Sequence, residues 1–497
     1  MSSGYILAVD QSTSGTKAVL FNTAGELVGR HNEMHRQFCP KPGWVEHDAE
    51  EIYENTLRAM KGVIEENGVP KAKIAALAIS NQRETAVVWD KRTGKPICHA
   101  VVWQCARGEQ ICHKLREAGC AQAVSEKTGL VLSPYFSAAK IKWILDNTEG
   151  ARQKAENGGL LCGNMDAWLI WKLTEGRVHA TDYSNAGRTQ LFNISRLDWD
   201  DELLGMFTIP RGMLPEVRPS GSIFGLTSCG GIFDKKIPIA GVLGDSNAAL
   251  FGQGCFKKGM AKATYGTGSS IMMNIGDSDI RSKKGIVTSI AWGLNGKVEY
   301  VFEGNINFAG ATTKWLAENL QLISNSKEAG EIASSVGGSG GVYLVPAFTG
   351  LGAPYWDSEA RAVITGMTAD TKKEHIVRAA EECIAYQIRD IVEVMNKEAG
   401  LKLRELRVDG GPTRDDFLMQ FQADMLSCNI VRNRIEELSA AGAAYMAGLC
   451  VKLWSGREEI LSLRKTEREF SPRMSEKTRE NLYSGWKSAV KKALYKG

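Results

Sequence analysis

The 497-residue sequence lacks several features by which a protein is usually assigned to a class. No apolar run approaches the ~18 residues that a membrane-spanning helix needs, and the N-terminus enters an apolar strand without a signal peptide's charged leader. The net charge is only +4, and no dense stripe of Lys and Arg with interleaved aromatic residues marks a nucleic-acid surface. We therefore expect a cytoplasmic protein that neither inserts into a membrane nor binds nucleic acid.

The motifs of the commonest nucleotide-binding and metal-binding sites are also missing. The sequence contains neither the GxxxxGK[ST] of a P-loop nor the GxGxxG of a dinucleotide-binding fold, which argues against P-loop ATPases and dehydrogenases. Its eleven cysteines form no paired CxxC motif, and the cluster between Cys98 and Cys120 lacks the His partners of a zinc site. We expect reduced thiols in a globular enzyme, whose length predicts two large domains.

One stretch in the middle of the chain stands out. Residues 237–243 form an apolar run typical of a buried strand that stops at Gly244, and Asp245 follows directly before a helical run. An acid at the carboxyl end of a buried strand lies where open α/β sheets bind their ligands, and it could take a proton from a bound hydroxyl. The alternative is that Asp245 only caps the next helix.

The N-terminus is predicted to form a hairpin of two apolar strands, residues 5–9 and 18–21. The turn at residues 10–17 contains several hydroxyls, one acid and one base, so its tip offers the N–H groups and the cation that a phosphate cradle needs. Asp10, at the end of the first strand, is well placed to hold Mg²⁺ through water. A hairpin rich in Ser and Thr is also a common turn without a function, and this alternative stays open.

Two further strand ends carry side chains that suit a polar ligand. Residues 74–80 form an apolar strand, and the adjacent opposite charges of Arg83 and Glu84 follow it. A ligand with several hydroxyls needs both donors and acceptors. Residues 100–103 form a second strand, whose Trp103 could pack against a carbon backbone. The alternatives are a surface ion pair for the two charges and an ordinary core position for Trp103.

The second half of the chain repeats the organisation of the first hairpin. Ala261–Tyr265 and residues 271–274 are predicted strands around a turn of Gly, Ser and Thr at residues 266–270, which suggests a duplicated fold around a central cleft. Further on, a strand runs into a double glycine ending at Gly411, and a helix is predicted from Asp415. Such a junction lets a nucleotide approach the backbone and presents N–H groups at a helix N-terminus, although it also serves as an ordinary turn.

With these segments in place, the chain resembles the FGGY carbohydrate kinases and, within them, the glycerol kinases. Residues 135–147 fit the family's first signature at every specified position, and residues 362–382 fit the second except at Glu381, where an apolar residue is expected. Other stretches similar to the glycerol kinases are residues 42–48, 81–85, 102–105 and 348–357. The resemblance implies an α/β fold of two actin-like, ribonuclease H-like domains, residues 1–252 and 253–497, with a catalytic cleft between them.

The resemblance also implies roles for individual residues. It makes Asp245 the catalytic base for transfer of the γ-phosphate of ATP to a primary hydroxyl of a small polyol, with glycerol, giving glycerol 3-phosphate, as the first expectation. It places the acceptor near Arg83, Glu84, Trp103, Tyr135, Asp245, Ser246 and Ser270. It places the nucleotide against Thr13, Ser14, Lys17, Gly266, Thr267, Gly310, Lys314, Gly411 and Asp415. Asp10, at its strand end, stays the Mg²⁺ candidate. A homodimer or homotetramer is expected.

Several positions depart from the glycerol kinase pattern. Ser246 stands where Gln usually follows the catalytic Asp, and Ser270 replaces the usual aromatic residue of the second hairpin. If both side chains line the acceptor pocket, it should be larger and more polar, and a four- or five-carbon acceptor such as erythritol, xylitol, xylulose or ribulose becomes the alternative. Neighbouring side chains or water could instead refill the space. Lys314 and Asp415 stand where glycerol kinases often have amides. Lys17 stands where Arg is usual, which keeps the positive charge but loses the bidentate geometry of a guanidinium.

A second alternative concerns the class of protein. Actin-like ATP-binding folds also serve as chaperones and filaments, but those lack the constellation of Arg83, Glu84 and Asp245. Residues 228–236 lack the Gly/Arg pattern that accompanies sugar-bisphosphate inhibition in bacterial glycerol kinases, so we expect this regulation to be absent. The prediction is therefore a polyol kinase, with a non-metabolic actin-like ATPase as the remote alternative.

Overall fold

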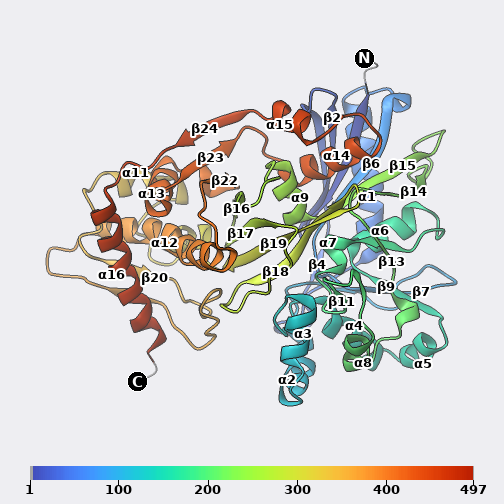
Figure 1. Cartoon of the computed structure of the whole chain (residues 1–497), viewed down its shortest axis with the longest axis horizontal. Helices are drawn as coiled ribbons and strands as arrows, with labels where there is room; N and C mark the ends of the chain where they lie inside the picture. The colour runs from blue at the N-terminus through green and yellow to red at the C-terminus, as the bar shows by residue number, and fades with distance from the viewer. Residues whose placement is uncertain (1–3, 496–497) are drawn as a thin grey trace.

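The computed structural model describes residues 4–495 and shows an α/β protein built on two large sheets (Figure 1). The first sheet has the strand order β14-β15-β6-β1-β2-β3. Its strands are β1 (Tyr5–Gln11), β2 (Gly15–Asn22), β3 (Leu27–Met34), β6 (Ile74–Asn81), β14 (Ile223–Thr227) and β15 (Ile237–Gly244). β6 pairs in parallel with both β1 and β15, and these three apolar strands are almost wholly buried, as parallel strands covered on both faces require.

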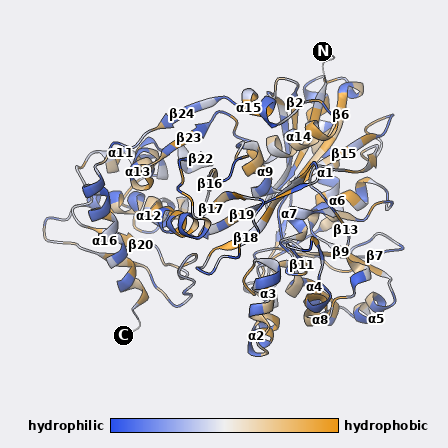
Figure 2. Cartoon of the chain, in the orientation of Figure 1, coloured by the Kyte–Doolittle hydropathy of each residue, from blue (hydrophilic) through white to orange (hydrophobic). Residues whose placement is uncertain are grey.

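Alternate residues of the first sheet contribute to two separate cores. Leu7 belongs to the core beneath α1 (Ala49–Glu66), whereas its neighbour Ile6 belongs to the core on the opposite face. That second face is covered by α9 (Asp245–Gly252) and by α14 (Leu438–Cys450). Successive side chains of a strand point to opposite sides, so the apolar run supplies both faces at once. Figure 2 shows hydrophobic residues concentrated along these strands.

The second sheet has the strand order β18-β19-β17-β16-β22-β23-β24. Its strands are β16 (Ala261–Tyr265), β17 (Ser269–Gly276), β18 (Val287–Leu294), β19 (Lys297–Ile306), β22 (Glu405–Asp409), β23 (Asn429–Asn433) and β24 (Thr466–Phe470). One face packs against α12 (Lys373–Ala399) and α13 (Asp416–Leu426), while Met272 on the other face joins the core that contains α9 and α14. The two sheets therefore meet through α9, which lies between them in Figure 1.

Smaller elements surround the two sheets. Short strands group as β4 (Gln37–Phe38), β5 (Glu46–His47) and β8 (Ala100–Val101); β7 (Val87–Asp90) and β9 (Leu160–Gly163); β10 (Ala180–Asp182) and β13 (Glu216–Arg218); β11 (Phe192–Asn193) and β12 (Asp198–Trp199); β20 (Tyr343–Val345) and β21 (Val363–Thr365). The other α-helices are α2 (Glu109–Glu117), α3 (Ala121–Thr128), α4 (Ser137–Asn147), α5 (Ala151–Glu156), α6 (Met165–Leu173), α7 (Tyr183–Ala186), α8 (Asp201–Phe207), α10 (Gly310–Glu318), α11 (Ala329–Ser334), α15 (Arg457–Leu463) and α16 (Glu476–Leu494). Within residues 4–495, no helix combines the length and apolar character that crossing a membrane would require.

The predicted strands at both hairpins and at the three strand ends are present, with small differences at their limits. The strand predicted at residues 100–103 is wrong in its second half, because β8 ends at Val101 and Trp103 lies in the turn that follows. The helix predicted from Asp415 begins one residue later, because the Asp415 side chain accepts a hydrogen bond from the N–H of Leu418 and so caps α13.

Helices α9 and α14 approach closely because small residues line their contact. A Cβ atom on Gly442 would lie only 1.8 Å from the carbonyl oxygen of Ala248, and one on Gly252 would lie 2.4 Å from that of Leu438. Any larger residue would push the helices apart. α14, from the C-terminal part of the chain, thereby holds α9 and its first residue, Asp245, against the first sheet.

Candidate active site

The carboxyl ends of β1 and β15 open into a cavity of about 280 Å³ whose walls come from both sheets. Its lining residues are Asp10, Asp245, Ser246, Ala249, Lys262, Thr264, Asp409, Gly410, Glu436, Glu437, Leu438 and Ser439. The two acids predicted at strand ends, Asp10 and Asp245, are thus brought together here. A polar cavity at the carboxyl ends of parallel strands is the usual place for a ligand in an open α/β sheet.

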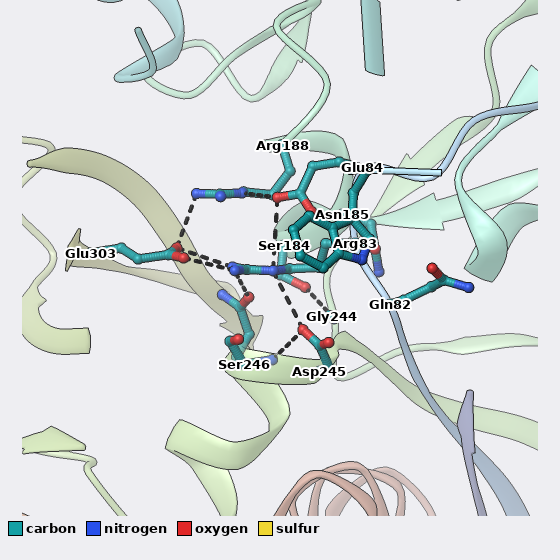
Figure 3. Close-up of polar contacts among 12 residues, drawn as sticks. Gln82, Arg83, Glu84, Ser184, Asn185, Arg188, Gly244, Asp245, Ser246 and Glu303 are labelled. Atoms are coloured by element: carbon teal, nitrogen blue, oxygen red, sulfur yellow. Dashed lines mark hydrogen bonds and ion pairs between the residues drawn. The ribbon is translucent and has the colours of Figure 1, made fainter. Parts of the chain in front are cut away.

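Asp245 is the first residue of α9, and Gly244 occupies the cap position before it. The Asp245 carboxylate accepts a hydrogen bond of 2.6 Å from the N–H of Ser246, and its side chain remains 39% exposed. Nε of Arg83 lies 3.5 Å from Oδ1 of Asp245 (Figure 3). The carboxylate is therefore oriented by one hydrogen bond and by the charge of Arg83 while it stays accessible from the cavity, which suits a proton acceptor better than a helix cap.

Arg83 and Glu84 do not form a surface ion pair, because both side chains are buried, at 5% and 2% exposure. Arg83 donates to both carboxylate oxygens of Glu303, at 2.7 and 3.0 Å, and to Oδ1 of Asn247 at 3.1 Å. Glu84 accepts from Arg188 at 2.5 Å and has a φ of 61°, a backbone conformation that non-glycine residues rarely adopt. The exposed-pair alternative is excluded.

A glycine makes the packing of Arg83 possible. A Cβ atom at Gly244 would lie 2.6 Å from Cγ and Cδ of Arg83, so a larger residue would displace the arginine from its place beside Asp245. The glycine that stops the apolar run in the sequence therefore has a steric role in the site.

The aromatic residues predicted for the acceptor lie together. The rings of Trp103 and Tyr135 are 5.5 Å apart in an edge arrangement, and the indole N–H of Trp103 donates to the hydroxyl of Thr13 at 3.0 Å. This bond connects the aromatic wall to the first hairpin. The ammonium group of Lys140, fully buried, donates to the carbonyl oxygens of Tyr135 and Phe136 and so fixes the position of the tyrosine.

The two serines that depart from the glycerol kinase pattern, Ser246 and Ser270, lie in different positions relative to the cavity. Ser246 lines the cavity beside Asp245, whereas Ser270 is absent from its described lining. Ser270 lies on β17 between Thr264 of β16 and Asn305 of β19. Its hydroxyl is buried and has no hydrogen-bond partner among residues 4–495. The structure therefore supports a polar cavity wall at Ser246 and leaves an unsatisfied hydroxyl at Ser270.

Four of the nine residues predicted for the nucleotide lie around the second hairpin: Gly266, Thr267, Gly310 and Gly411. The N–H of Gly310 donates to the carbonyl oxygen of Gly266 at 3.0 Å, and the N–H groups of Ala309 and Ala311 donate to that of Thr267. A Cβ on Gly310 would lie 3.1 Å from Cγ of Pro412, the residue after Gly411, so the glycine junctions adjoin. Their bare backbone offers a surface that a phosphate or ribose could approach closely.

The other nucleotide candidates are more scattered. Nζ of Lys17 is 2.8 Å from a carboxylate oxygen of Glu437, and exposed Ser14 follows Thr13 in the first turn. Lys314 forms an ion pair with Glu318 at 3.6 Å on an exposed face of α10, and no described contact joins it to Asp415.

Glu381, which departs from the second family signature, is buried. Burial and, to a smaller extent, the charge of Asp415 raise its pKa well above the usual range.

Several charged residues of the site were not predicted from the sequence: Arg188, Lys262, Glu303, Asp409 and Glu437. Arg188 follows α7 in a segment without periodicity, and Glu303 is an acid within the apolar strand β19. An acid inside an apolar strand is the one signal that could have been noticed, because buried charges are rarely left unpaired. Burial opposes ionisation of Glu303, but the charges of Arg188 and Arg83 lower its pKa to about 2.

Comparison with known proteins identifies the chain over its whole length. The profile described as "FGGY family of carbohydrate kinases, N-terminal domain" matches residues 5–252, and the corresponding C-terminal profile matches residues 261–450. A glycerol kinase of Caldanaerobacter subterraneus subsp. tengcongensis is 54% identical over 490 residues, which cover 99% of this chain and 98% of that protein. Glycerol kinase 2 of Thermotoga maritima is also 54% identical, with 99% of both chains covered.

Solved structures agree with this match. The crystal structure of Plasmodium falciparum glycerol kinase with ADP has a TM-score of 0.95 and 38% identity, covering 100% of this chain and 99% of that one. A ligand-bound xylulose kinase from Lactobacillus acidophilus has a TM-score of 0.89 at 20% identity over 98% and 97% of the two chains, a likeness of fold alone. The predicted fold of two actin-like domains is confirmed. The profiles, the full-length relatives and the polar cavity between the sheets together show that this chain belongs to the FGGY family of carbohydrate kinases, enzymes that phosphorylate an alcohol group with ATP.

Proposed function

We propose that this chain phosphorylates glycerol to glycerol 3-phosphate. The observation that carries the proposal is the 54% identity, over nearly the whole chain, to proteins called glycerol kinases. The arrangement of Asp245, Arg83 and the Trp103–Tyr135 pair supports it, because a small polyol needs a proton acceptor, a donor and an apolar wall. The ADP in the Plasmodium falciparum relative supports ATP as the phosphoryl donor.

In this reaction Asp245 accepts the proton of the acceptor's primary hydroxyl as the hydroxyl oxygen attacks the γ-phosphorus in line. The bond from that phosphorus to the β–γ bridging oxygen breaks, and ADP leaves. The N–H of Ser246 and Nε of Arg83 orient the carboxylate toward the acceptor, and such positioning is the main contribution of the protein to phosphoryl transfer. Arg83, Glu84, Trp103 and Tyr135 hold the polyol. Closure of the cleft excludes water, which would otherwise compete as an acceptor.

The polyphosphate is assigned to the two hairpins. On one side, Thr13, Ser14 and Lys17 supply hydroxyls and a positive charge; on the other, the backbone of Gly266, Thr267, Gly310 and Gly411 allows close approach. Lys17 has a carboxylate partner in Glu437, so phosphate binding requires this lysine to share or exchange its partner. Lys314 and Asp415 remain our candidates for contacts at the base end of the nucleotide.

The residues present fit Mg²⁺ as the accompanying metal. Burial raises the pKa of Asp10 to about 6, the hydroxyl of Ser80 opposes this, and the charge of Asp245 adds to it, so a cation between the two carboxylates would relieve their repulsion. Among residues 4–495 no group of three or more His, Cys, Asp or Glu is arranged to hold a metal ion. Asp10 and Asp245 would therefore hold hydrated Mg²⁺ through water, and the ion would neutralise phosphate charge.

A longer acceptor remains the second candidate function. The observation that favours it is the small, polar side chain of Ser246 in the cavity wall beside the base. A further hydroxyl of a four- or five-carbon polyol or ketose could hydrogen-bond to Ser246, whereas the buried hydroxyl of Ser270 lies outside the described cavity wall.

Steady-state kinetics with glycerol, erythritol, xylitol, xylulose and ribulose test both candidates. We expect kcat/KM to be highest for glycerol; a higher value for a longer acceptor would contradict the glycerol proposal and favour the alternative. Asp245→Asn should lower kcat by about 10²–10⁴-fold, the usual contribution of a general base, while ATP binding is retained. The matched control is Asp277→Asn, an exposed acid outside the cavity, which should leave kcat unchanged.

We propose a cytoplasmic enzyme that assembles as a homodimer or homotetramer, which sedimentation would decide. We divide the chain near residue 252, into an acceptor-binding part, residues 1–252, and a nucleotide-binding part, residues 253–497. The change of sheet between β15 and β16 supports this division.

A further inference from the structure

Four buried charged side chains connect the two sheets beside Asp245 (Figure 3). Arg83 and Glu84 follow β6 of the first sheet, Arg188 follows α7, and Glu303 lies on β19 of the second sheet. Each side chain is at most 5% exposed, and the two positive and two negative charges balance. Glu303 is the single member of this quartet that the second sheet provides.

Glu303 determines which edge of the Arg83 guanidinium faces Asp245. Nη1 and Nη2 of Arg83 donate to the two oxygens of Glu303, at 3.0 and 2.7 Å, in a bidentate pair. Nη1 also donates to Asn247. Nε is the nitrogen that remains toward Asp245, at 3.5 Å. Because a guanidinium is planar and its donors are fixed relative to one another, anchoring one edge fixes the direction of the other.

Glu303 acts on Glu84 as well, through Arg188. Nη1 of Arg188 donates to Glu303 at 2.9 Å, and Nε of the same side chain donates to Glu84 at 2.5 Å. Glu84 has a φ of 61°, so its position depends on surrounding contacts rather than on backbone preference. One carboxylate of the second sheet thus holds both charged residues that the proposed function assigns to the acceptor.

We infer that Glu303 is a positioning residue for acceptor recognition: it orients Arg83 directly and Glu84 through Arg188, so the acceptor site is complete only when the second sheet is docked on the first. This inference rests on the proposed function. Its consequence is that losing Glu303 impairs binding of the polyol while leaving the nucleotide surface around Gly266 and Gly411 intact.

The test compares Glu303→Gln with Glu303→Asp and with the control Glu299→Gln. Gln keeps the shape but turns an amide N–H₂ toward a guanidinium, and Asp keeps the charge on a shorter side chain. Glu299 lies on the same strand, accepts from Asn274 at 2.9 Å and pairs with Arg457 at 2.6 Å, outside the quartet. KM for glycerol and for ATP, kcat, and the shift of Tm on adding each ligand are measured for every variant.

For Glu303→Gln we expect KM for glycerol to rise about 10–100-fold, the loss typical of a hydrogen bond to a charged group, with KM for ATP changed less than about threefold. The glycerol-induced shift of Tm should disappear and the nucleotide-induced shift should persist. Glu303→Asp should recover part of the loss, and Glu299→Gln should show none of it.

An unchanged KM for glycerol, or equal increases in both KM values, would overturn the inference, since equal increases indicate general structural damage. If Glu303→Gln does not fold, the same comparison is made with Glu303→Asp, whose two KM values decide in the same way. If the wild-type enzyme shows no glycerol-dependent ADP release, the proposed function itself fails. That outcome differs from an active wild type whose Glu303→Gln variant has an unchanged KM for glycerol, which overturns the inference alone.

Discussion

A pair of buried histidines behind the active site predicts a specific sensitivity to acid. His47 is fully buried, and its ring lies 4.8 Å from that of His35 at 74°. Nδ1 of His47 accepts from the amide of Gln82 at 3.3 Å, while Oε1 of Gln82 accepts from Thr85. Thr85 in turn accepts the N–H of Trp103 at 3.2 Å. A proton added to His47 would break a chain that ends at the acceptor wall.

The size of the expected loss of stability in acid follows from the pKa of His47. Burial, with a smaller contribution from the charge of His35, lowers this pKa from 6.5 to about 3. Below pH 6.5, therefore, His47 binds a proton in the unfolded chain but stays neutral in the folded protein. The free energy of unfolding consequently falls as the pH decreases toward about 3. The loss is about 1.4 kcal/mol per pH unit, hence about 2 kcal/mol at pH 5. His35, whose pKa burial also lowers, adds in the same direction.

The assay compares the Tm of wild type and His47→Asn at pH 7.5 and pH 5. Asn keeps an acceptor near the position of Nδ1 and cannot be protonated in this range. Between the two pH values, wild type should lose about 4–8 °C more than the variant, given 2–4 °C per kcal/mol for a domain of this size. Comparing the two proteins is necessary because buried Asp166, with a pKa raised to about 7 by burial and by Asp182, changes the stability with pH in the opposite direction.

Equal losses of Tm in wild type and in His47→Asn would refute the reasoning. The control variant His113→Asn, at an exposed position, should behave like wild type.

Three further substitutions, the first with a matched control, test the packing of the protein. Gly442→Ala should destabilise the protein by about 1–3 kcal/mol because its Cβ would meet the backbone of α9, whereas Gly205→Ala in α8, with open space around it, should be neutral or slightly stabilising in the same thermal melts. Ser246→Gln should raise KM for xylitol more than KM for glycerol, because a longer side chain in the cavity wall would reduce room for the longer acceptor; equal effects would contradict this. Lys140→Met should raise KM for glycerol by about tenfold or more by releasing the carbonyl of Tyr135, and an unchanged value would show that the loop holds its position alone.

Much of the fold could be predicted from the sequence because strand ends are marked locally. The apolar run that becomes β15 stops at Gly244, and the first polar residue after it is Asp245, so strand and acid are read together. The hairpins are similarly local, since Gly, Ser and Thr interrupt apolar strands at residues 10–17 and 266–270. Features that are encoded within about ten consecutive residues could therefore be predicted from the sequence.

The partners of Arg83 could not be predicted, because they depend on contacts between distant segments. Glu303 is 220 residues from Arg83, and its inward direction follows from the register of β19 on β17, where it lies opposite Met272. Arg188 follows a four-residue helix and has no periodic pattern around it. The joint placement of Ser246 and Ser270 in one pocket was expected from the family pattern, yet the described cavity contains Ser246 alone of the two.

The close contact of α14 with α9 also bears on how the polypeptide can be divided. α14 comes from residues 438–450, yet it covers the face of the first sheet to which Ile6 and Leu243 contribute. A fragment ending at residue 252 would leave those side chains exposed to water and prone to association. The same fragment mixed with residues 253–497 should recover a covered sheet, since the missing helix would be supplied in trans. α14 is thus made nearly two hundred residues after β15 and still later after β1 and β6, so a ribosome must complete most of the chain before Asp245 acquires this support.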